Sequence, residues 1–73
     1  MGKSKKHHVL GYINSRNHPI CDKCIELALG YEFDTVNHIN RPLSRKGIIN
    51  RYKDKCPSCS VVRLVNSHKN LST

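Results

Sequence analysis

The 73-residue chain has no tryptophan, a single phenylalanine and only five acidic residues, against 13 lysines and arginines. No run approaches the roughly 18 apolar residues of a membrane-spanning helix, so we expect no membrane partner. The few, scattered acidic residues give little support to chemistry that uses paired carboxylates. Residues 1–8 contain no apolar stretch, and a secretory signal is therefore not expected.

Length and charge narrow the class of protein further. A chain of this size forms one domain, buries only about 60% of its unfolded surface, and usually needs a covalent or metal link. The formal net charge is +8. A small basic domain is typical of nucleic-acid binding, although acidic proteins and anionic lipids also attract such a charge. We expect a cytoplasmic or nucleoid-associated protein.

The four cysteines fall into two C-x-x-C pairs: Cys21 with Cys24, and Cys56 with Cys59. Zinc binds four thiolates as a tetrahedron, and each C-x-x-C turn directs two sulfurs at one centre. Two such pairs without a secretory signal favour a metal over disulfides. We therefore predict one structural Zn²⁺, although an iron–sulfur cluster takes the same ligands. His18 lies near the first pair, where a surface or capping role fits better than metal binding.

A zinc ion held by four cysteines has no open position for water. Such a site is structural, and we expect no enzymatic activity. Its apparent binding free energy of about 10–16 kcal/mol would stabilise the folded state of so small a chain. The ion would tie the start of the second expected helix to the loop that carries the second cysteine pair.

Apolar periodicity predicts three helices. The first covers about residues 5–15, and the second covers residues 19–29 with Pro19 as its first residue and Asn17 or His18 as its cap. Gly30 stands where a helix favours a left-handed residue at its C-terminus. The third covers about residues 34–46, with Asp34 expected to cap it by accepting from a backbone N–H. Pro42 lies inside this helix and is expected to kink or restart it.

Two β-branched segments follow the helices. Residues 48–53 and 60–66 are predicted to be strands, joined by a loop that holds the second cysteine pair. The expected organisation is a flexible basic arm at residues 1–8, a zinc-stabilised domain at 9–66 and a polar tail at 67–73. The expected fold class is small α+β.

The order helix, helix, turn, helix and β-hairpin resembles that of winged helix-turn-helix domains, the MarR-like and related regulators. The residues that carry the resemblance are 25–31 (IELALGY), 34–39 (DTVNHI) and 43–49 (LSRKGII). It implies a three-helix winged helix-turn-helix with a C-terminal β-hairpin wing, to which the zinc clip is an addition. These families usually carry no cysteines here and rarely a proline at the position of Pro42.

The resemblance also implies a function. The protein would bind double-stranded DNA, as a transcriptional regulator, with the helix near 34–46 in the major groove and the basic wing on phosphates. The expected DNA-binding residues on the helix, which we expect to be exposed, are Thr35, Asn37, His38, Asn40 and Arg41, with Ser44 and Arg45 nearer the DNA backbone. On the wing they are Arg51, Lys53, Lys55 and Arg63.

Two alternatives stay open. The first is a small protein–protein interaction module, such as a phage, plasmid or virus-like accessory factor, which predicts a contiguous apolar surface patch. The second is an RNA-binding zinc protein, which is weaker because at least some of the few aromatic residues are needed in the core. No dimerisation helix is visible, so the protein is expected to be a monomer or a weak dimer.

Overall fold

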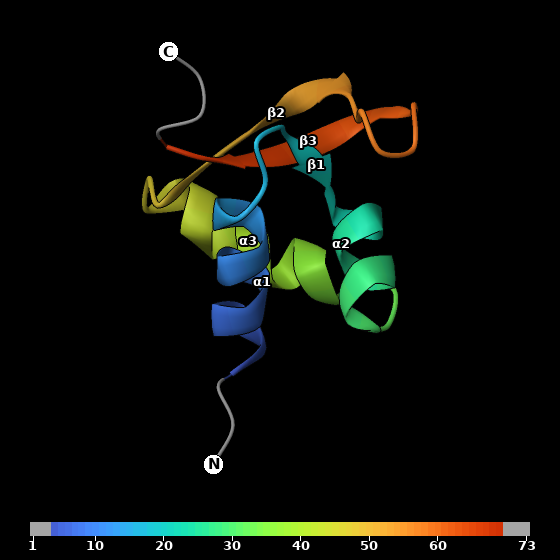
Figure 1. The fold of residues 1–73 in the computed structure, drawn as a ribbon. Helices are drawn as coiled ribbons and strands as arrows, with labels where there is room; N and C mark the ends of the chain where they lie inside the picture. The colour runs from blue at the N-terminus through green and yellow to red at the C-terminus, as the bar shows by residue number, and fades with distance from the viewer. Residues whose placement is uncertain (1–3, 70–73) are drawn as a thin grey trace.

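The computed structural model describes residues 4–69, which form three helices and a three-stranded antiparallel sheet (Figure 1). The elements are α1 (Lys5–Asn14), β1 (Ile20–Cys21), α2 (Asp22–Leu29), α3 (Thr35–Arg45), β2 (Ile49–Lys55) and β3 (Val62–His68). The strand order is β1-β3-β2, so the short first strand pairs with the last. The small α+β class expected from the sequence is confirmed.

The core lies between the helices and one face of the sheet (Figure 1). Apolar side chains from every helix and every strand converge there. Its fully buried aliphatic members are Val9, Ile13, Ile20, Ile25, Val36, Leu43, Ile49 and Val65. Each contributes about 1.5–3 kcal/mol by leaving water. The longest helix of the described chain, α3, has 11 residues, and none of the described helices is long and apolar enough to cross a membrane.

The second helix begins later than the sequence predicted. Ile20 and Cys21 form β1 and pair with Asn66 and Val65 of β3, and Cys21 takes the N-cap position of α2. The expectation that Pro19 opens the helix, capped by residue 17 or 18, is therefore wrong. Pairing with β3 requires an extended backbone here and overrides the local helical period. The expected helix end is confirmed, with Gly30 left-handed at φ 74°.

The start of α3 is stabilised by a residue other than the expected one. Asp34 occupies the N-cap position, but its side chain makes no capping hydrogen bond, and its φ of 71° is left-handed. Instead the Glu26 carboxylate, from α2, accepts from the backbone N–H of Val36 at 3.0 Å. Glu26 is buried, so this bond also satisfies a charge that would otherwise be costly to bury.

Pro42 does not end α3, which continues to Arg45. Its pyrrolidine lies on the exposed side of the helix, where water can reach the carbonyl that has lost its donor. The helix closes where Ile48 donates its N–H to the carbonyl of Leu43 at 2.9 Å. Gly47, with φ 75°, supplies the left-handed residue that this closure needs.

The terminal segments also differ from expectation. The first helix, expected at about residues 5–15, is confirmed as α1, so residues 5–8 belong to a helix and the flexible arm assigned to them is wrong. β2 and β3 both run to later residues than expected, and Ser67, assigned to the polar tail, is buried within β3. The backbone pairing of Ile49 with His68 explains the later end of β3, and that of Lys55 with Val62 explains the later end of β2. Residues 1–3 of the arm and 70–73 of the tail lie outside the described residues.

Candidate metal centre and nucleic-acid interface

The four cysteines lie together, as their spacing predicts. β1 and the first turn of α2 supply Cys21 and Cys24, while the loop between β2 and β3 supplies Cys56 and Cys59. All four Sγ atoms lie within 4.8 Å of one another, and all four cysteines are free. The Sγ atoms of Cys21 and Cys59 are 3.7 Å apart, and those of Cys56 and Cys24 are 3.8 Å apart.

These distances fit a metal ion. Zn–S bonds of about 2.3 Å in a tetrahedron place neighbouring sulfurs about 3.8 Å apart. The four cysteines can thus bind an ion such as zinc. His18 is not part of the cluster, because its Nδ1 lies 3.0 Å from the carbonyl oxygen of Pro19.

The thiols differ in their acidity. Burial raises the pKa of Cys21 and Cys24 above the ordinary value. Burial also raises the pKa of Cys56, but backbone N–H groups of Cys21, Cys59 and Ser58 outweigh it and lower the pKa to about 6. The N–H of Cys21 lies 3.4 Å from Sγ of Cys56. Donation to sulfur favours the thiolate, which is the form that binds metal.

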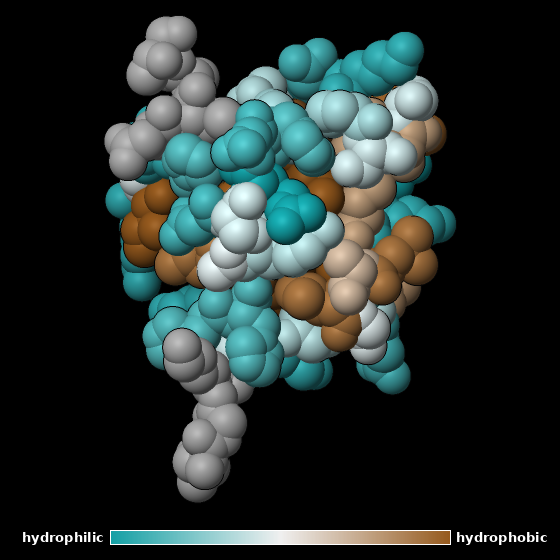
Figure 2. Space-filling model, in the orientation of Figure 1, coloured by the Kyte–Doolittle hydropathy of each residue, from teal (hydrophilic) through white to brown (hydrophobic). Residues whose placement is uncertain are grey.

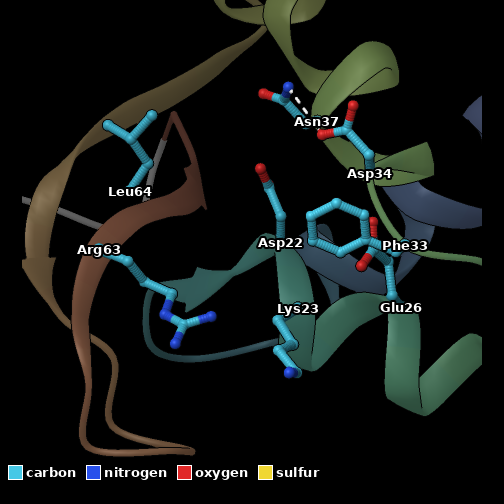
Figure 3. A pocket seen from close by; sticks show the side chains of 8 residues that line it. All are labelled: Asp22, Lys23, Glu26, Phe33, Asp34, Asn37, Arg63 and Leu64. Atoms are coloured by element: carbon cyan, nitrogen blue, oxygen red, sulfur yellow. Dashed lines mark hydrogen bonds between the residues drawn. The ribbon is translucent and has the colours of Figure 1, made fainter.

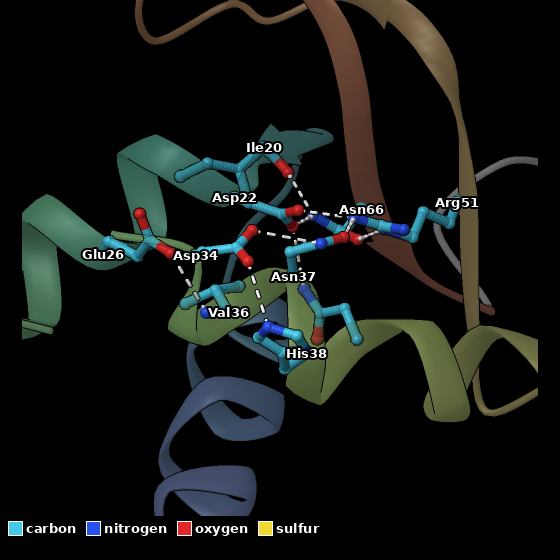
Figure 4. A network of polar contacts seen from close by, with 10 residues as sticks. Ile20, Asp22, Glu26, Asp34, Val36, Asn37, His38, Arg51 and Asn66 are labelled. Atoms are coloured by element: carbon cyan, nitrogen blue, oxygen red, sulfur yellow. Dashed lines mark hydrogen bonds and ion pairs between the residues drawn. The ribbon is translucent and has the colours of Figure 1, made fainter. Parts of the chain in front are cut away.

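Figure 4 shows a network of polar side chains that sequence reasoning missed. Asp22 is its centre and lies between two cysteines in the sequence. Its Oδ1 accepts from Asn66 at 2.8 Å and from Asn40 at 3.2 Å, and its Oδ2 pairs with the Arg51 guanidinium. Arg51 also donates to Asn66 at 3.1 Å and to Asn37 at 2.9 Å. The network therefore joins α2, α3, β2 and β3 through hydrogen-bonded side chains.

Three residues expected at the DNA interface, Asn37, Asn40 and Arg51, belong to this network. Asn40 is fully buried, and the Arg51 side chain is only 9% exposed. The expected exposure of Asn40 is therefore wrong, and Arg51 is not free for phosphates, because both side chains fix α3 and β2 against Asp22. The sequence did carry a signal for Asn40. It lies four residues after Val36 and three before Leu43, on the stripe that faces the core.

The remaining expected residues divide by exposure. Thr35, Asn37, Ser44 and Arg63 are half-buried, whereas His38, Arg41, Arg45, Lys53 and Lys55 are exposed. His38, Arg41 and Arg45 follow one another at helical spacing and form a stripe on the outer side of α3. The Nε2 of His38 lies 3.0 Å from a carboxylate oxygen of Asp34. We call the five exposed residues the basic face.

Apolar side chains are also exposed. Phe33 is 88% exposed and Leu27 is 73% exposed. Figure 2 shows apolar surface gathered over the region of α2, beside largely hydrophilic surface. Phe33 points outward from the turn before α3, whereas Tyr12 and Tyr31 pack against the core, so the expectation that at least some aromatic residues are needed there is confirmed.

The comparisons with protein-family models, curated proteins and solved structures found no match to this chain.

Proposed function

We propose that this protein is a metal-stabilised, double-stranded DNA-binding domain of the winged helix-turn-helix kind, acting as a transcriptional regulator. The observation that carries the proposal is the basic face. Its two arginines and two lysines have no acidic partner among residues 4–69, where the ion pairs involve only His38 and Arg51. Arg41 and Arg45 on the outer side of α3, and Lys53 and Lys55 on β2, are free cations suited to phosphates and base edges.

The order of the elements supports the same proposal. Three helices precede a hairpin, as in the winged helix-turn-helix domains that the sequence resembles, and α3 follows α2 after a short turn. In this arrangement α3 lies in the major groove. Arg41 reads guanine through two hydrogen bonds, and His38 and Arg45 contact bases or phosphates beside it. Lys53 and Lys55 bind phosphates, which position the domain without specifying sequence.

The metal supplies rigidity in this account. Cys21, Cys24, Cys56 and Cys59 would hold a zinc ion whose coordination shell is closed, so the ion does no chemistry on DNA. Closing the cluster fixes the hairpin turn against the beginning of α2. Asp22 then connects the same segment to α3 through Asn40 and Arg51. The orientation of α3 relative to the hairpin is thereby set from two sides.

The proposal is tested by variants of the basic face in a duplex-binding assay. Replacing Arg41 and Arg45 by alanine should weaken binding of the zinc-loaded protein at least about tenfold and flatten its salt dependence. Leu27→Ala is the matched control, because Leu27 is exposed on α2 and carries no charge. Unchanged duplex affinity in the double variant would refute the proposal.

One observation favours a second candidate, a protein-interaction module. The exposure of Leu27 and Phe33 leaves apolar surface uncovered, as a docking site for another protein would. Such binding would vary little with salt, and Leu27→Ala would weaken it. The same titrations therefore distinguish the two candidates.

A further inference from the structure

A pocket of about 220 Å³ lies between α2, the beginning of α3 and β3 (Figure 3). Phe33 and Leu64 supply its apolar walls. Phe33 is 88% exposed and Leu64 is 44% exposed. An aromatic ring left so open at the edge of a pocket is unusual for a monomeric domain, in which large apolar side chains are normally covered.

The acidic groups around the pocket already have partners. Asp22 is paired with Arg51, Glu26 accepts from the N–H of Val36, and Asp34 contacts Asn37 and His38. These hydrogen bonds stabilise each carboxylate and leave it a free lone pair, and Asp22 is in addition paired with the charged guanidinium of Arg51. The pocket can therefore accept hydrogen bonds without presenting three unpaired negative charges.

The two cations at the pocket, unlike its acidic groups, have no ionic partner within the described residues. Lys23 and Arg63 form no ion pair with any residue that the structure describes. The Nε of Arg63 is buried and has no hydrogen-bond partner among these residues. Because Nε is enclosed, only the terminal nitrogens of this half-buried guanidinium are available to an anionic or carbonyl oxygen from outside the chain.

We infer that this pocket binds one unpaired nucleotide of a single-stranded nucleic acid. The base stacks on the ring of Phe33 and against Leu64, and its phosphate lies on Arg63 and Lys23. Aromatic stacking combined with nearby cations is how proteins bind single strands without sequence preference. The inference extends the proposed function, because duplex reading by the basic face needs no unpaired base.

The chemistry favours a nucleotide over an acidic peptide. A base offers amino N–H donors to the acceptors of Asp34 and Asn37, while its phosphate offers an anion to the cations. An acidic side chain supplies only the anion. The pocket is also continuous with α3, since Asp34 and Asn37 lie at the beginning of that helix. A strand leaving the basic face can therefore reach it.

The chain has no tryptophan, so Phe33→Trp introduces a single fluorescent reporter into the full-length, zinc-loaded protein. We expect its emission to be quenched by a short single-stranded oligodeoxyadenylate and not by polyglutamate. Phe33→Leu, made in the protein without the tryptophan, should weaken binding of the labelled oligonucleotide about tenfold, because leucine has no aromatic face on which a base can stack. Arg63→Gln should weaken it as well, while Leu27→Ala should not.

Absence of quenching by the single strand, or an unchanged affinity in Phe33→Leu, would overturn the inference. Equal quenching by polyglutamate would overturn it in favour of an acidic peptide. The outcome is separable from that of the proposed function. If duplex binding does not depend on Arg41 and Arg45, but the single strand still quenches the emission of the Phe33→Trp variant, only the duplex proposal fails.

Discussion

Arg51 is the residue whose loss should reveal the polar network most clearly. Its side chain is 9% exposed, and its partner Asp22 is 19% exposed. Arg51→Met keeps most of the aliphatic stem but removes the only cation that faces Asp22 among the described ion pairs. Breaking a buried pair from one side costs about 3–5 kcal/mol, because a charge stays buried without compensation. A small domain has about 5–15 kcal/mol in total, so the loss should be large.

The measurement is urea unfolding of the zinc-loaded protein, followed by circular dichroism. Asp22→Asn keeps the shape of the carboxylate and removes its charge, so the double variant with Arg51→Met should be less destabilised than the two single losses added together. A coupling of about 0.5–3 kcal/mol is expected for groups in direct contact. A loss below about 1 kcal/mol for Arg51→Met, or strict additivity, would refute the reasoning that this network fixes α3.

Three further predictions follow from the site. Cys56→Ser should lower zinc affinity and the thermal unfolding midpoint together, because metal-binding free energy stabilises the folded state in a domain of this size. Co²⁺ absorption measures metal binding, and thermal melts measure the midpoint. A folded, metal-free variant of normal stability would contradict the prediction. As pH is lowered near neutrality, zinc affinity should fall by at least about a hundredfold per pH unit. The reason is that Cys21 and Cys24, whose pKa values are raised, must each lose a proton to bind the ion. A chelator competition from pH 8 to 6.5 tests this prediction, and an affinity that does not change with pH would exclude it. Glu26→Ala should destabilise the protein by about 1–3 kcal/mol, because it leaves the N–H of Val36 without its acceptor. Glu26→Gln should destabilise the protein less. Chemical denaturation compares the two variants, and equal losses of stability would argue against the hydrogen bond.

The sequence predicted those features that depend on local pattern. The spacing of the cysteines predicted their cluster, and the position of Gly30 predicted the end of α2, because each follows from one residue type at one position. β1 could not be predicted in this way. Two residues carry no period, and Ile20 and Cys21 are extended only because β3 lies beside them.

The polar network was missed for a related reason. Asn40 and Arg51 are residue types that usually face water, and they were assigned to the surface for that reason. Their burial depends on Asp22, which is distant from both in the sequence. The helical period of α3 places Asn40 on the core stripe and could have identified it. Nothing local identifies the partner of Arg51, since the pairing arises only when β2 pairs with β3 and packs against α3.

The central claim is that the metal-loaded domain binds duplex DNA through the basic face. Its most direct test is a titration of the zinc-loaded protein with random-sequence duplex DNA at several salt concentrations. With the two arginines and two lysines of the basic face each neutralising one phosphate, the logarithm of the binding constant should fall with the logarithm of salt concentration at a slope of about −3.6. Absence of binding at low salt, or binding without salt dependence, would contradict the account.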